Sequence, residues 1–239
     1  MIRAGIQAAW ELVMRWPWPL PGDADRDVTL PQAARYLPVM GLLLGVAGLL
    51  VFLLLALVVG SWVALSASAS LLLVFGNWWL TRARAINGFL QVASGWPARG
   101  GVDSGTMTVW QLNAGQGLIL LKLLGVGVLL ASGNAVWYIA APVIAWTVYG
   151  EIALAGETRD EASGSGPVHW YIAAGIVLVV AIFVGMLIPG LLALLLGWLG
   201  AGPMRRWFAR AGQADADKAA LATVECIEVL VLWIGVLAL

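Results

Sequence analysis

Two glutamates near the C-terminal end of the chain have the type and spacing to take part in metal-dependent chemistry. Glu225 and Glu228 lie three residues apart in an apolar stretch, and on an α-helix this spacing places both side chains on one face. Carboxylate oxygens are preferred ligands of Mg²⁺, which commonly also binds the phosphates of a substrate. The pair therefore indicates a Mg²⁺ site for a phosphate-bearing substrate. The alternative is that the carboxylates reach water or pair with Lys122 or an arginine.

Two further charged residues, Lys122 and Glu151, interrupt or border apolar stretches. A charge in the middle of a membrane span costs about 2.5–3.5 kcal/mol on insertion scales, so each one needs a reason. With the spans given below, all four charges lie toward the cytoplasmic ends of their helices, and we expect them to border one pocket open to the cytoplasm. The simpler interpretation is that Lys122 snorkels or is paired, and that Glu151 is solvated at the end of its span.

The sequence has few residues that could form other kinds of catalytic or metal site. The chain has one cysteine, Cys226, and one histidine, His169. One cysteine forms neither an internal disulfide nor a cysteine-based metal cluster. We therefore interpret Cys226 as a small buried side chain, and we do not expect a histidine metal site or a serine–histidine triad.

The composition predicts that lipid surrounds most of the chain. Of the 239 residues, 62% are apolar and only 11% are charged, whereas a soluble domain has about 25% charged residues. The net charge is zero, which gives no indication of nucleic-acid binding. At about 20 residues per span, we expect an all-α, polytopic membrane bundle of about seven transmembrane helices, forming a single domain of residues 1–239.

The apolar stretches define these spans. They cover residues 36–60, 62–80, 115–131, 136–155, 168–202 and 221–239. The fifth stretch is too long for one span, and Pro189 and Gly190 divide it, which favours a helical hairpin; one long, kinked helix is the alternative. Glycines repeated in the first span are expected to be helix-packing sites.

Three polar segments accompany the spans. Residues 1–35 are predicted to form an interfacial helix, ended by Pro17 and Pro19, and a cytoplasmic segment. Residues 81–114 read as a cytoplasmic mixture of short helix and loop, and 203–218 as a charged loop. The helix is indicated by apolar positions at helical spacing, namely Ile2, Ile6, Ala9, Trp10, Val13 and Met14.

The positions of the basic residues predict the orientation. Four precede the first span, three lie in 81–111, one in 157–167 and four in 203–218, which accounts for twelve of the 13. These segments fall on one side only if 168–202 is a hairpin. Because basic loops stay in the cytoplasm, we expect a cytoplasmic N-terminus and an external C-terminus.

Two N-terminal motifs resemble those of one known enzyme family. Residues 13–19 read V-M-R-W-P-W-P, similar to a family pattern L-T-R-x-P-x-P, and residues 35–45 read R-Y-L-P-V-M-G-L-L-L-G, similar to R-x-F-P-L-V-G-L-L-L-G. The Ala141-Pro142-Val143 block and the glutamates of the last span continue the correspondence over nearly the whole chain. The sequence thus resembles the cobalamin synthases, the adenosylcobinamide-GDP ribazoletransferases.

This resemblance implies a location and an activity. The location is the bacterial inner membrane. The activity joins adenosylcobinamide-GDP to α-ribazole or its phosphate and releases GMP, with Mg²⁺ bridging the phosphates. The family's aspartate-rich loop matches residues 81–95, where Asn87, Gln91 and Ser94 stand at aspartate positions. Trp146 stands at the position of a family arginine. Amides and hydroxyls add no negative charge, so the residues that replace the three aspartates are expected to weaken Mg²⁺ binding.

Three functions stay open at this point. The first is a divergent transferase that uses Glu225, Glu228 and Asp103. The second is a catalytically degenerate paralogue. It would bind a corrinoid or nucleotide ligand, a second copy of itself in a homo-oligomer, or an active homologue. The third is a small transporter. The residues expected around the pocket are Asn87, Gln91, Ser94, Asp103, Lys122 and Glu151, with Glu225 and Glu228 as the expected metal ligands.

Overall fold

The computed structural model describes residues 2–14, 16, 30–94, 109–154, 167–212 and 216–239. Within these ranges all regular structure is helical, which confirms the predicted all-α bundle. The helices are α1 (Ile2–Val13), α2 (Leu30–Ala34), α3 (Leu37–Ala56), α4 (Trp62–Leu80), α5 (Arg84–Ser94), α6 (Val109–Ala131), a 3₁₀-helix (Ala135–Ile139), α7 (Ala140–Leu154), α9 (Val168–Val184), α10 (Leu187–Gly212) and α11 (Ala216–Leu237).

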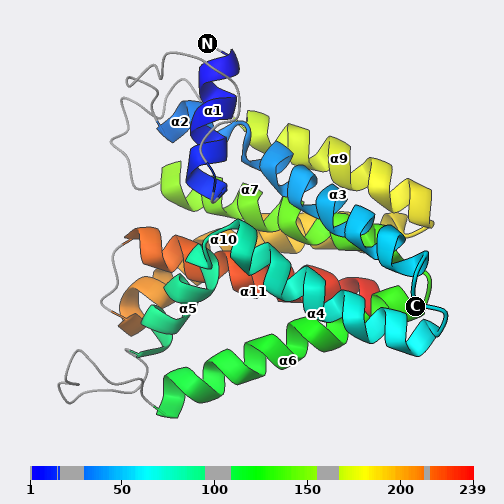
Figure 1. Cartoon of the computed structure of the whole chain (residues 1–239). Helices are drawn as coiled ribbons and strands as arrows, with labels where there is room; N and C mark the ends of the chain where they lie inside the picture. The colour runs from blue at the N-terminus through cyan, green and yellow to red at the C-terminus, as the bar shows by residue number, and fades with distance from the viewer. Residues whose placement is uncertain (1, 15, 17–29, 95–108, 155–166, 213–215) are drawn as a thin grey trace.

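Six helical stretches of the described chain are long and apolar enough to cross a membrane, and α9 is a shorter apolar helix. The 17 residues of α9 extend for about 26 Å at 1.5 Å per residue, slightly less than the thickness of a bilayer core. Helices α1, α2 and α5 and the ends of α7 and α10 lie at one end of the bundle, whereas the short turns and the C-terminus lie at the other (Figure 1). The chain is therefore built as a multi-pass membrane protein.

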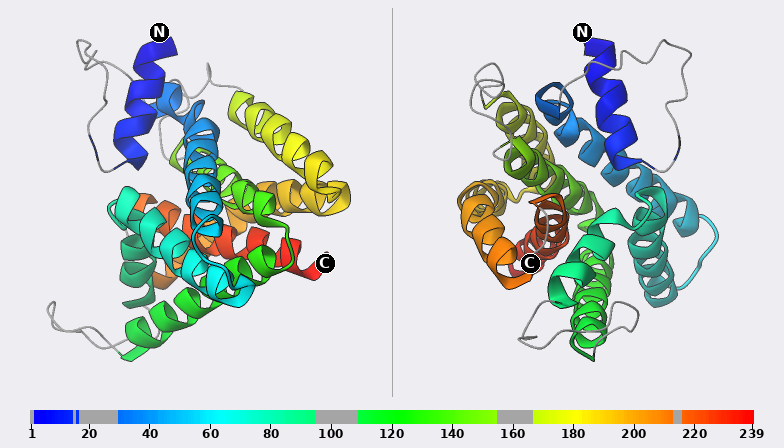
Figure 2. Two further views of the ribbon diagram at one scale, coloured as in Figure 1. Left: turned by 45° about the vertical axis from the view of Figure 1, so that its right-hand side comes forward. Right: turned by 90° about the vertical axis from the view of Figure 1, so that its left-hand side faces the viewer.

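The core of the bundle is formed by α7 and α11. The span that contains α7 is 89% buried and the span that contains α11 is 67% buried, against 22% for α10. Helix α7 packs against α3, α9, α10 and α11, while α11 also packs against α5 and α6. Both views in Figure 2 show these two helices surrounded by the others.

Glycines of α3 allow this close packing, as predicted. A Cβ atom on Gly41 would lie 2.5 Å from the carbonyl oxygen of Pro142, and one on Gly45 would lie 2.7 Å from the Cα of Ile139. Small residues at helix contacts let two backbones approach each other, which is a main source of packing energy in membranes.

The predicted hairpin in residues 168–202 is confirmed, but the position of its break was wrong. The turn lies at Gly185, which ends α9 in the left-handed conformation with φ of +74°. Pro189 instead sits in the first turn of α10, where its missing N–H leaves no helical bond unmade. Gly190 packs against Ala181 of α9, where a Cβ would approach to 2.6 Å.

Several predicted boundaries also need correction. The charged loop 203–218 is helical up to Gly212, with Pro203 inside α10, and α11 already begins at Ala216. Pro203 removes only the helical bond to the carbonyl of Leu199, on an exposed face, and the alanines and arginines that follow favour helix. Helix α6 begins at Val109, six residues before its predicted start. Glu225 and Glu228 consequently lie in the middle of α11 and not, as predicted, near its N-terminal end.

The polar segment after α4 contains the short helix that was predicted, and residues 95–108 lie outside the described ranges. Arg82 and Ala83 have φ of +56° and +53°, a left-handed turn that is unfavourable for side chains with a Cβ. This turn directs α5 back against α11, where a Cβ on Gly88 would lie 2.6 Å from the Cβ of Leu221. The Arg84 guanidinium donates a hydrogen bond to the carbonyl of Leu12, which links α5 to α1.

Candidate functional site

Three charged side chains meet in the interior of the bundle. Lys122 of α6 places its Nζ 2.5 Å from Oε2 of Glu225 and 2.5 Å from Oε2 of Glu228, both on α11. The three residues are only 3%, 1% and 5% exposed. We call Lys122, Glu225 and Glu228 the buried triad. The predicted shared helix face for the two glutamates is thus observed, and the proposed pairing with Lys122 is the alternative that the structure shows.

Trp78 of α4 joins the buried triad to a third helix. Its indole Nε1 donates a hydrogen bond of 3.0 Å to Oε1 of Glu225. Its ring centre lies 5.7 Å from the Lys122 Nζ, within the range of a cation–π contact. Trp78 was not among the predicted site residues. The only signal in the sequence is that an indole N–H inside a membrane span needs an acceptor.

The two carboxylates hold the ammonium in different ways. Lys122 donates a hydrogen bond to Oε2 of Glu228. Oε2 of Glu225 lies at the same distance but receives no hydrogen bond of good geometry from any residue that the structure describes. With all three side chains ionised, the cluster carries one net negative charge in a site that is closed to water. Removing one partner from such a buried ion pair costs about 3–5 kcal/mol.

The buried triad does not fit a Mg²⁺ ion. The ion usually keeps several waters in an octahedral shell of oxygens, but here the inner oxygens of both carboxylates face an ammonium group. A second cation at this place would be repelled by Lys122 and would have only two acidic ligands. Over the ranges given above, no three His, Cys, Asp or Glu side chains are grouped to hold a metal ion.

Those of the other predicted pocket residues that the structure describes are not part of the triad. Asn87 and Gln91 lie on α5 and are exposed. Ser94 is the last residue of α5, its side chain is not among those described, and Asp103 lies outside the described ranges. The prediction of one pocket open to the cytoplasm and bordered by all four charges is therefore wrong. The predicted third and last spans begin several residues after the true starts of α6 and α11. Lys122, Glu225 and Glu228 were therefore placed near helix ends, whereas they lie in the middle of their helices.

Glu151 belongs to a second polar group, between α7 and α9. Its Oε2 lies 2.9 Å from Nε2 of His169 and accepts a hydrogen bond of 3.2 Å from the indole of Trp170. Its side chain is 44% exposed, whereas that of His169 is 3% exposed. The expectation that Glu151 is merely solvated is therefore only half right. His169, which stands alone in the sequence, finds its partner 18 residues away across the 155–166 connection.

Trp146, which stands where the resembling family has an arginine, is fully buried in α7. Its ring contacts Tyr149 edge to face, with centres 5.5 Å apart. Its Nε1 has no hydrogen-bond partner among the described residues. At this position the chain thus has a packed aromatic side chain and no positive charge for a phosphate.

No protein-family profile matches the sequence, and no curated protein or solved structure gives a significant match. The fold and the site define a class on their own. The chain is a helical, multi-pass membrane protein with a lysine ion-paired to two glutamates at the centre of three helices.

Proposed function

We propose that this chain is a catalytically degenerate relative of the cobalamin synthases that serves as a binding subunit in the bacterial inner membrane, with its N-terminus in the cytoplasm. The observation that carries this proposal is the position of Lys122. Its ammonium lies between the two carboxylates whose spacing predicted a metal site. A built-in ammonium occupies the place of a metal ion with only one of its two positive charges, and it cannot bridge the phosphates of a substrate.

The surrounding residues support the same proposal. Asn87 and Gln91 bring no negative charge to the segment where the family has aspartates, and both are exposed on α5. Trp146 brings no positive charge to the centre of α7. The chain would therefore bind a corrinoid or nucleotide ligand, or an active homologue beside it, without turning a substrate over.

Turnover by the purified full chain tests this function. The protein, in detergent or nanodiscs, is mixed with adenosylcobinamide-GDP, α-ribazole and Mg²⁺, and GMP release is followed. We expect no release above that of an empty-nanodisc control. We also expect the chain to change the rate of an active ribazoletransferase added to the same membrane. Turnover that Glu225→Ala abolishes would contradict a non-catalytic role, and an unchanged rate of the active enzyme would contradict the role as its subunit.

A small transporter is a second candidate, and the buried triad favours it as well. Ionisable residues in the middle of membrane spans commonly mark ion or substrate pathways. Reconstitution in liposomes with an internal pH-sensitive dye tests this alternative. A proton flux that depends on the protein and disappears in Lys122→Met would support it, while vesicles as tight as protein-free ones would oppose it.

A further inference from the structure

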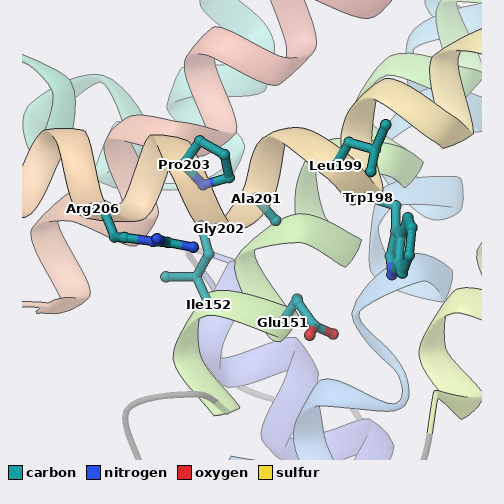
Figure 3. Close-up of a pocket in the computed structure, with 8 residues that line it drawn as sticks. All are labelled: Glu151, Ile152, Trp198, Leu199, Ala201, Gly202, Pro203 and Arg206. Atoms are coloured by element: carbon teal, nitrogen blue, oxygen red, sulfur yellow. The ribbon is translucent and has the colours of Figure 1, made fainter.

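A cavity of about 330 Å³ lies where the end of α7 meets α10, away from the buried triad. Glu151 lines it from α7, and Trp198, Leu199, Pro203 and Arg206 line it from α10 (Figure 3). Its volume is at the lower end of the range of small-molecule sites, about 300–1,000 Å³. It suits a group of a few heavy atoms and is too small for a corrinoid linked to a nucleotide.

Two opposite charges face this cavity without neutralising each other. Glu151 contacts His169 at 2.9 Å and forms no ion pair with Arg206 among the described side chains. The Nε2 of His169 points at the carboxylate, and its Nδ1 is buried without a partner among the described residues. A charged imidazole would leave an N–H unbonded at Nδ1, so the geometry favours a neutral ring with its proton on Nε2. The negative charge of Glu151 is therefore left for a ligand.

The apolar wall of the cavity continues onto the lipid-facing surface. Trp198 is 59% exposed and Leu199 is 51% exposed, and α10 is the least covered of the candidate spans. Tryptophan is enriched at the level of lipid headgroups. Arg206 follows two turns later on the same helix, at the end of the bundle where the basic segments gather. An occupant would thus meet hydrocarbon on one side and a pair of opposite charges on the other.

We propose that this cavity binds the headgroup of a zwitterionic phospholipid that carries a primary ammonium, as in phosphatidylethanolamine. Arg206 binds the phosphate, since a guanidinium donates two parallel hydrogen bonds to phosphate oxygens. Glu151 accepts hydrogen bonds from the ammonium, and the acyl chains lie along Trp198 and Leu199. A trimethylammonium headgroup donates no such hydrogen bond, and an anionic headgroup offers Glu151 no cation. This site shares no residue with the buried triad and is independent of the proposed function.

Lipid-dependent thermal stability of the purified full chain tests the proposal. The protein in a neutral detergent is titrated with phosphatidylethanolamine, phosphatidylcholine or phosphatidylglycerol, and with soluble phosphoethanolamine. We expect saturable stabilisation by phosphatidylethanolamine at a concentration about fivefold lower than by the other two lipids, and none by the soluble headgroup. A fivefold difference corresponds to the contribution of about one exposed charge pair.

Variants assign the effect to the cavity. Glu151→Gln should remove most of the preference for phosphatidylethanolamine, because only this carboxylate distinguishes the primary ammonium. Arg206→Gln should weaken the stabilisation by all three lipids, because all three carry the phosphate that Arg206 binds. The controls Glu11→Gln and Arg3→Gln on α1 remove the same charges elsewhere and should leave the preference intact. Three results would overturn the proposal: equal stabilisation of the wild type by all three lipids, a preference that survives Glu151→Gln, or lipid stabilisation that Arg206→Gln leaves unchanged. Saturable stabilisation by phosphoethanolamine alone would replace the lipid with a soluble phosphoester as occupant, and would overturn it as well.

Discussion

Replacing Lys122 with methionine removes the ammonium group from the buried triad and keeps a side chain of similar length. The variant leaves Glu225 and Glu228 facing each other in a site that is at most 5% exposed. An uncompensated buried charge costs about 3–5 kcal/mol, and Lys122 contacts two carboxylates at 2.5 Å. We therefore expect Lys122→Met to lower the free energy of unfolding by about 3–5 kcal/mol, a large share of the roughly 5–15 kcal/mol of a folded protein.

Unfolding by SDS in mixed micelles, followed by tryptophan fluorescence, measures this loss. The informative control is the triple variant with Lys122→Met, Glu225→Gln and Glu228→Gln, which keeps the shapes but removes all three charges. Neutral replacements of complete buried ion pairs are often tolerated, so we expect the triple variant to recover most of the stability. If Lys122→Met were as stable as the wild type, or no less stable than the triple variant, the ion pairs would not be the interaction that stabilises this site.

Three smaller predictions concern neighbouring features and use the same unfolding assay. Trp78→Phe removes the hydrogen bond to Glu225 and should cost about 1.5–3 kcal/mol; a negligible change would mean that water or another donor replaces the indole. Gly41→Ala should cost about 1–3 kcal/mol, because its Cβ would collide with the α7 backbone, whereas Gly76→Ala, which faces open space, should be neutral or stabilising. A Cβ on Gly185 would meet no neighbouring atom, so Gly185→Ala should lower the free energy of unfolding only by the cost of a left-handed backbone, about 1–2 kcal/mol. No loss would mean that the turn rearranges.

The bundle was predictable from the sequence because hydropathy and charge both constrain it. The hairpin of α9 and α10 followed from placing the basic segments on one side, a constraint that involves the whole chain. The break at Gly185 was not predictable in the same way. Pro189 can either interrupt a helix or begin one, and the sequence does not distinguish the two. The extension of α10 beyond Pro203 was missed for the same reason, since a single proline inside an exposed helix removes only one backbone bond.

The buried triad was predictable in part. The spacing of Glu225 and Glu228 fixes their common face, and this is a local property of a helix. Their partner Lys122 lies 103 residues earlier than Glu225, on a helix whose neighbours depend on the packing of α4, α6 and α11. Only the three-dimensional structure decides between a metal ion and a lysine as the cation for two carboxylates. The contact between Glu151 and His169 depends in the same way on how α9 packs against α7.

Binding of Mn²⁺, a spectroscopic substitute for Mg²⁺, tests most directly whether Lys122 takes the place of a metal ion. Electron paramagnetic resonance measures the concentration of free Mn²⁺ while the purified full chain is titrated with the ion. Glu225→Gln is the matched variant. We predict that the wild type binds no more Mn²⁺ than Glu225→Gln, since the carboxylates are already occupied by an ammonium group. A stoichiometric Mn²⁺ site that Glu225→Gln removes would contradict this account.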